Sequence, residues 1–161
     1  MKIIGRIDDH LEEVMLVFLM TYFVFVVVAQ VIARFVLQVP AAWTEETGRY
    51  AFIWLTFIGA SYATKKGMHI RMDIMESYLG PIAAGRLKLL SMLIFLAFLL
   101  IMSGIGLSVC QTLLAKPQKS PVLGLPMLAV YAAMPVGMIL SAIRMLQWFY
   151  LELYKKKTAG I

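Results

Sequence analysis

The sequence predicts an all-α integral membrane protein with four transmembrane helices, short interfacial amphipathic helices and both termini in the cytoplasm. Of the 161 residues, 61% are hydrophobic and 15% are charged, whereas soluble domains are about half apolar and a quarter charged. The apolar residues also form long blocks, and about 20 such residues in one helix cross a bilayer. We therefore treat residues 1–161 as a single membrane domain.

Four apolar blocks define the expected transmembrane spans. Thr44 is a suitable N-cap for the second and shortest span, because acidic residues follow it in the first helical turn. Pro135 lies inside the fourth span and should kink it, since proline cannot donate the backbone hydrogen bond of a helix. The spans cover about residues 14–35, 47–64, 89–114 and 125–151.

The polar connections predict an interfacial helix and an orientation. Residues 70–79 are amphipathic, and Gly80–Pro81 should end a short helix near Leu79. The net charge of +6 comes from bases that flank the apolar blocks, which favours membrane orientation over nucleic-acid binding. With four spans, one side of the membrane receives ten bases and is therefore assigned to the cytoplasm: Lys2, Arg6, Lys65, Lys66, Arg71, Arg86, Lys88, Lys155, Lys156 and Lys157.

No ionisable side chain is expected at the centre of a span, where ion-coupled transporters usually keep one. The polar residues at the outer ends of the first two spans either dock a partner or touch a solute, or they are helix-end anchors that pair with each other and with lipid headgroups. Glu45 and Arg49 are spaced as a helical ion pair. This group comprises Gln30, Arg34, Glu45, Glu46 and Arg49. We expect no catalytic, cofactor-binding or metal-binding residue in this chain.

Small residues recur every four positions in three spans. Such spacing lets helix backbones approach closely in lipid, where the hydrophobic effect does not drive helices together. Each stripe serves either packing inside one bundle or contact with another protein. The stripes are Ala129, Ala133, Gly137 and Ser141; Gly104 and Ser108; and Gly59 and Ala63.

A series of short motifs runs through nearly the whole chain. They are Arg34–Phe35, Trp43-Thr44-Glu45-Glu46, Arg49–Tyr50, Trp54, Gly59–Ala60, Gly67-Met68-His69-Ile70, Asp73, the stretch 120–126, Tyr131 and Pro135-Val136-Gly137. Their order and spacing resemble those of the DctQ-like small membrane subunit (Q subunit) of tripartite ATP-independent periplasmic (TRAP) transporters.

The resemblance implies a role that composition alone does not. Such a subunit is a non-enzymatic scaffold in the bacterial inner membrane that pairs with a large M-type membrane subunit, which holds the sodium and substrate sites. A periplasmic substrate-binding protein of the P type delivers an organic acid such as a C4-dicarboxylate, sialic acid or a related sugar acid. The implied partner or scaffold contacts are Arg34, Trp43, Glu45, Glu46, Arg49, Trp54, His69, Asp73, Pro126, Tyr131 and Gly137.

Other membrane roles remain open at this stage. The chain could anchor or help assemble another complex, or act alone as a four-span exporter. A haem-binding anchor would need histidines on the spans, and both His10 and His69 lie outside the apolar blocks. A cluster at the outer side is expected to fix the first two helices together and to shape the face near the partner proteins; its members are Arg34, Trp43, Glu45, Glu46 and Arg49.

Overall fold

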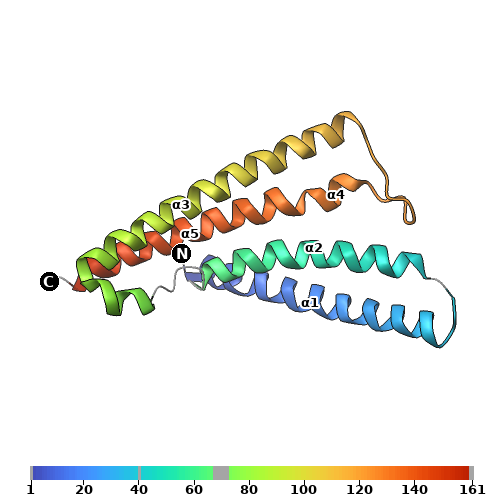
Figure 1. The fold of residues 1–161 in the computed structure, drawn as a ribbon, viewed down its shortest axis with the longest axis horizontal. Coiled ribbons are helices and arrows are strands. Elements are labelled where there is room, and N and C mark those ends of the chain that lie inside the picture. Colours follow the sequence, from blue (N-terminus) through green and yellow to red (C-terminus); the bar gives the residue numbers. More distant parts are fainter. Residues whose placement is uncertain (1, 40, 67–72, 160–161) are drawn as a thin grey trace.

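The computed structural model describes residues 2–39, 41–66 and 73–159, and these form a helical bundle (Figure 1). The all-helical expectation is confirmed in this part of the chain, where the only β-type pairing is an isolated bridge between Lys119 and Pro126. The helices are α1 (Lys2–Phe35), α2 (Ala42–Lys65), α3 (Asp73–Ala115), α4 (Met127–Tyr131) and α5 (Ala133–Ala159).

Three segments of the described chain are long and apolar enough to cross a membrane. They match the first, third and fourth expected spans to within a few residues and lie in α1, in α3 and across α4 and α5. The expected second span, residues 47–64, lies in α2 and is not among them. The three segments are Glu12–Phe35, Gly85–Ala115 and Met127–Tyr150.

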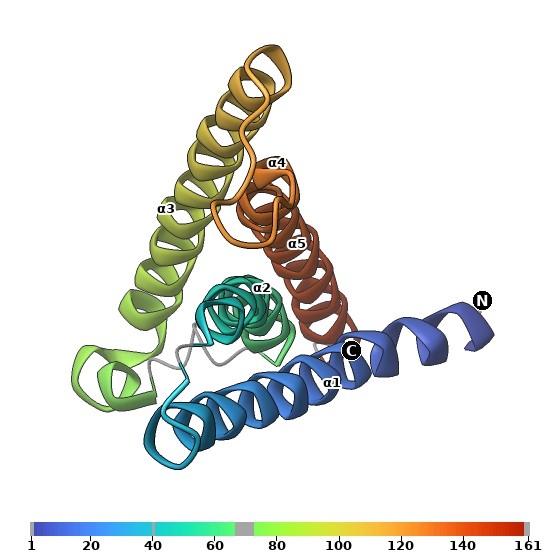
Figure 2. The ribbon, with the colours of Figure 1, turned by 90° about the vertical axis from the view of Figure 1, so that its right-hand side faces the viewer.

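The helices follow one another across the bundle in the order α1, α2, α5, α3. α2 packs against α1 on one side and α5 on the other, and α3 packs on α5. Viewed along the bundle, α2 therefore lies at the centre with the other long helices around it (Figure 2). The helices spread apart toward the end that carries α4, here named the α4 end. The opposite end, where α1 begins and α5 ends, is named the terminal end (Figure 1).

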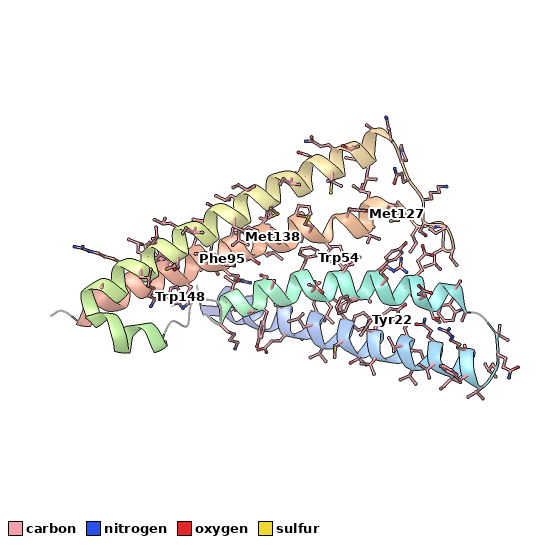
Figure 3. All side chains as sticks on the ribbon, viewed as in Figure 1. Tyr22, Trp54, Phe95, Met127, Met138 and Trp148 are labelled. Atoms are coloured by element: carbon pink, nitrogen blue, oxygen red, sulfur yellow. The ribbon has the colours of Figure 1, made fainter. Side chains whose placement is uncertain are left out.

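The contact between α3 and α5 contains the main apolar core. Met92, Leu99, Ala142 and Met145 are buried there. Phe95, Met138 and Trp148 pack against them between the two helices (Figure 3). Near the terminal end the Lys88 ammonium lies 4.9 Å from the centre of the Trp148 ring, a cation–π contact that joins the same two helices.

α2 is buried through small and polar side chains. It begins at Ala42 with Ala41 in the N-cap position, so the expectation that Thr44 caps this helix is wrong. The Thr44 hydroxyl instead donates to the Ala41 carbonyl at 2.6 Å from inside the first turn. The buried residues of α2 are Thr44, Glu46, Gly48, Ala51, Ile58, Ser61 and Thr64.

Prolines act differently in the two helices that contain them. α3 continues from Asp73 through Pro81 to Ala115, so no separate helix ends near Leu79. Its first turns lie at an angle to the rest (Figure 1), as expected when a helix bends and continues past a proline. The predicted start of the interfacial helix, residues 70–72, lies outside the described residues.

The kink expected at Pro135 is confirmed as a break at Ala132, between α4 and α5. Because Pro135 has no N–H and its ring would clash with the carbonyl four residues earlier, the helix cannot run straight past Tyr131. The helix resumes directly after Ala132, since the Val136 N–H donates to the Ala132 carbonyl at 3.1 Å.

The small residues of α5 serve packing inside the chain. Ala133, Gly137 and Ser141 are buried, and a Cβ placed on Gly137 would lie 2.6 Å from the Phe57 Cβ of α2. In α3, by contrast, a Cβ placed on Gly104 would meet no atom within 4 Å.

We predict that Gly137→Ala lowers the stability of the folded chain by roughly 1–3 kcal/mol, the usual cost of overpacking. The new methyl group would also approach the Phe57 carbonyl oxygen to 2.8 Å, and backbone atoms cannot turn away as a side chain would. Thermal unfolding in detergent measures the effect. Gly104→Ala is the matched control, and equal melting temperatures for the two variants would contradict the packing assigned to Gly137.

Candidate functional site

A buried carboxylate organises the α4 end of the bundle. Glu46 lies in the first turns of α2 and is only 7% exposed. The Tyr50 hydroxyl, one turn further along α2, donates to Glu46 Oε1 at 2.6 Å. The backbone N–H of Leu123 donates to Oε2 at 2.9 Å. Glu46 therefore joins α2 to the connection between α3 and α4.

That connection, residues 116–126, is folded so that it presents the Leu123 amide. The Ser120 N–H donates to the Leu125 carbonyl at 2.8 Å, and the Leu125 N–H donates back to Ser120 Oγ at 3.1 Å. Gly124 has a φ of +66°, a left-handed conformation that glycine adopts without strain. The turn thus depends on the stretch from Ser120 to Pro126 that the sequence analysis singled out.

The surroundings of Glu46 favour its charged form. Burial alone would raise the pKa of this carboxyl. Hydrogen bonds from Tyr50, Ser120 and the backbone amides of Leu123 and Val122 outweigh burial and lower the pKa below its ordinary value. A carboxylate that is ionised and bonded on both oxygens acts as a strong link between two segments.

A groove of about 580 Å³ lies beside this link, between α2 and the segment that contains α4. Glu45 and Arg49 form an ion pair of 2.9 Å at its edge, with side chains 62% and 65% exposed. Further along α2, Trp54 Nε1 donates to the Ala129 carbonyl at 3.2 Å and so ties α2 to α4 (Figure 3). The groove is lined mainly by apolar and aromatic side chains: Ala42, Glu45, Glu46, Arg49, Tyr50, Ile53, Phe57, Pro121, Val122, Met127, Val130, Tyr131 and Met134.

The structure brings some of the residues expected at the site together and separates others. Glu45, Glu46, Arg49 and Tyr131 line the groove. The others lie elsewhere or have other roles. Trp54 donates a hydrogen bond to α4, and Pro126 directly precedes α4. Trp43 is exposed on α2, and Arg34 is exposed on α1 with its guanidinium over the Phe35 ring. Gly137 packs on Phe57, Asp73 begins α3, and His69 lies outside the described residues.

We expected the polar group to fix the first two helices to each other. Glu46 instead accepts one hydrogen bond from Leu123 of the connection 116–126 and one from Tyr50 of its own helix. Glu45 pairs within its own helix, with Arg49. Glu46 and Trp54 therefore tie α2 to the chain that follows α3.

Sequence reasoning missed a second polar cluster, at the terminal end. Arg144 lies inside the expected fourth span, yet the sequence analysis assigned it no role. Its Nε donates to Glu12 Oε1 at 2.8 Å, and both side chains are 7% exposed. Ser61 Oγ lies 3.5 Å from the same oxygen, and Lys65 Nζ lies 3.9 Å from Glu12 Oε2. One signal was available: Glu12 lies just before the first apolar block, and Arg144 is a lone charge near the end of the last one.

The neighbouring residue on α1 makes a parallel contact with α2. Glu13 Oε1 accepts a hydrogen bond from the Tyr62 hydroxyl and lies 3.7 Å from Lys66 Nζ. Glu12 thus lies beside Ser61 and Lys65, and Glu13 lies beside Tyr62 and Lys66. Neighbouring residues of α1 therefore contact neighbouring residues of α2. Glu12 and Glu13, which precede the first expected span, make helix–helix contacts that their sequence position alone did not indicate.

Comparison with known proteins decides the family. The family described as "Tripartite ATP-independent periplasmic transporters, DctQ component" matches residues 23–153, which is most of the chain. This chain belongs to the DctQ family. The resemblance drawn from the short motifs is therefore confirmed, and this DctQ chain is a small permease subunit of the TRAP type.

Curated relatives agree with this assignment. An isethionate TRAP transporter permease protein DctMQ from Oleidesulfovibrio alaskensis is 32% identical over 90% of this chain, which spans only 24% of that longer relative. A putative TRAP transporter small permease protein from Haemophilus influenzae is 29% identical over 89% of this chain and 88% of the relative. The ectoine TRAP transporter small permease protein TeaB from Halomonas elongata is 29% identical over 89% of this chain and 76% of its own length.

We predict that Glu46→Gln loosens the connection 116–126, because an uncharged amide offers the Leu123 N–H a weaker acceptor. Hydrogen exchange of the Leu123 amide should become at least severalfold faster. In the unmodified chain the same loosening should appear on acidification below the ordinary carboxyl pKa, because the lowered pKa of Glu46 means that its contribution is present above that value and is lost as pH falls.

Glu45→Gln is the matched control, since Glu45 is exposed and pairs only weakly through solvent. If the control accelerated exchange at Leu123 as much as Glu46→Gln does, the buried carboxylate would not be the link.

Proposed function

We propose that this DctQ chain is the small, non-catalytic scaffold subunit of a sodium-coupled TRAP transporter that imports an organic acid. It pairs with a large M-type membrane subunit, which carries the sodium and substrate sites. It also helps a periplasmic P-type binding protein to dock. The sequence match to small permease subunits over most of the chain supports this assignment.

One structural observation carries the scaffold role: among the residues whose burial is described, the buried carboxylates Glu12 and Glu46 both make contacts between segments of this chain. Glu46 joins α2 to the connection 116–126, and Glu12 joins α1 to Arg144 of α5. An ion-coupled binding site needs polar groups that turn toward the transported ion. Charges that hold helices together suit a fixed frame against which another subunit moves.

Substrate choice is assigned to the partner subunits. The relatives are named for different substrates, including isethionate, ectoine, C4-dicarboxylate and sialic acid, although they share this small component. A common frame that serves different substrates is expected if specificity resides in the large subunit and the binding protein. An organic acid is the substrate class we propose for this transporter.

We further propose that α2 is a fourth transmembrane span and that both termini are cytoplasmic in the inner membrane. With 24 residues, α2 is about 36 Å long, which exceeds the thickness of a hydrocarbon core. Its buried polar residues, among them Ser61 and Thr64, need not face lipid, because α1 and α5 pack on either side of α2. The first turns of α1 and the last turns of α5 lie at one end of the bundle (Figure 1), as an even number of crossings requires.

We predict that the connections before α2 and before α4 are both periplasmic. Cysteines introduced as Gln38→Cys or Lys119→Cys, with native Cys110 changed to serine, should react with a membrane-impermeant maleimide added to spheroplasts. Cysteine at Lys66, next to the terminal end, should react only after lysis. Labelling of the Gln38 and Lys119 positions from opposite sides would contradict a crossing by α2.

We predict that the chain alone moves no organic acid when reconstituted in proteoliposomes, because it supplies the frame and not the transport site. Flux should appear when an M-type large subunit and a P-type binding protein of the same transporter are added with a sodium gradient. Co-purification of the large subunit with this chain is the second measurement. Flux through the chain alone would overturn the scaffold role, and co-purification with an unrelated enzyme would indicate a membrane anchor.

A further inference from the structure

The buried pair of Glu12 and Arg144 joins two helices that do not pack on each other. In the described part of the chain, no Cα atom of α1 lies within 8 Å of a Cα atom of α5. The carboxylate and the guanidinium nevertheless meet at 2.8 Å, 132 residues apart in sequence. The two long side chains bridge α1 and α5 beside α2, which packs on both helices.

We infer that this pair is a clasp that sets the position of α1 relative to α5 and closes the terminal end of the bundle. Its members are Glu12 and Arg144, supported by Ser61, Lys65 and Gln147. The inference concerns the architecture of the chain and does not depend on the proposed transport role.

α2 leaves room for the clasp because Ser61 is small and fully buried at this level. Its hydroxyl lies 3.5 Å from Glu12 Oε1, beside the guanidinium contact. On α5, Arg144 also donates from one terminal nitrogen to Gln147 Oε1 at 2.9 Å, one turn away. This second hydrogen bond fixes the orientation of the planar guanidinium, so that its Nε–H is directed at the Glu12 carboxylate.

α1 is the helix that most needs such a contact. Only 6% of its candidate membrane span is buried in the chain, compared with 39% of the span that contains α4 and α5. Most of its apolar side chains are exposed on the chain, where lipid can cover them in many rotations, so they contribute little to the position of α1 relative to α5. A directional polar contact distinguishes one register from the others, because a shift of one residue would leave a charge in an apolar environment.

Ion pairs of this kind often add little net stability. Removing two charges from water costs about as much as their attraction returns, and apolar replacements of both partners can be neutral. Breaking one side is costly, because the remaining charge stays buried. Stability and positioning can therefore be separated by comparing single and double variants.

The test uses the full-length chain in lipid nanodiscs with Cys110→Ser. Spin labels at Phe18→Cys on α1 and Leu146→Cys on α5, both exposed positions, report the distance between the two helices. Glu12→Gln should lower the melting temperature by about 10 °C and broaden this distance distribution. Glu12→Leu combined with Arg144→Met should recover at least half of the lost melting temperature, yet keep the broadened distance distribution.

Glu45→Gln is the matched control, because it breaks an ion pair of nearly the same length that is exposed. It should change the melting temperature by less than about 3 °C and leave the distance unchanged. If Glu12→Gln does not fold, the double variant decides the question. A double variant with the unmodified distance distribution, or a Glu12→Gln effect no larger than the control, would overturn the clasp.

Discussion

Polar side chains buried among apolar helices need partners, and the arrangement of the whole bundle depends on how α2 obtains them. Backbone groups are satisfied within each helix, but α2 also carries buried Thr44, Glu46, Ser61 and Thr64. Part of this polarity is satisfied locally, since the Thr64 hydroxyl donates to the Ala60 carbonyl at 2.9 Å. The charged groups need partners from other elements. α2 therefore lies between α1 and α5, and the two most apolar helices, α1 and α3, take the outer positions where lipid can cover them.

The buried carboxylates of Glu46 and Glu12 obtain their hydrogen-bond donors from different kinds of structure. Glu46 receives donors from a tyrosine and from a backbone amide, so its site is specified by a folded turn. Glu12 receives a guanidinium, so its site is specified by another helix. The two clusters contact α2 about 15 residues apart, which is about 22 Å along a helix. α2 is thus held near both ends by polar contacts. Between them, Gly48 of α2 packs against Val26 of α1, and Phe57 of α2 packs against Gly137 of α5.

The sequence predicted those features that depend on local pattern. Long apolar blocks located three candidate spans, and Pro135 located the break between α4 and α5, because both signals lie within one continuous stretch of sequence. Pro81 misled the prediction because a helix can bend and continue when tertiary context supports it. Glu45 and Glu46 are adjacent, so composition could not say which one is buried. Their side chains point about 100° apart, and only the fold of residues 116–126 selects Glu46. The pairing of Glu12 with Arg144 links positions 132 residues apart, and no local period reveals it.

The small residues show how far spacing alone can be taken. In α5 the predicted stripe coincides with the helix contact, because Gly137 lies against Phe57 of α2. In α3 the predicted pair, Gly104 and Ser108, is exposed. The glycine that packs inside the chain is Gly106, where an added Cβ would lie 2.9 Å from Pro135 Cδ. Two residues correspond to about 200° around a helix, so Gly104 and Gly106 lie on nearly opposite faces. A four-residue spacing identifies a face that permits close approach, and the neighbouring helix determines which such face is used.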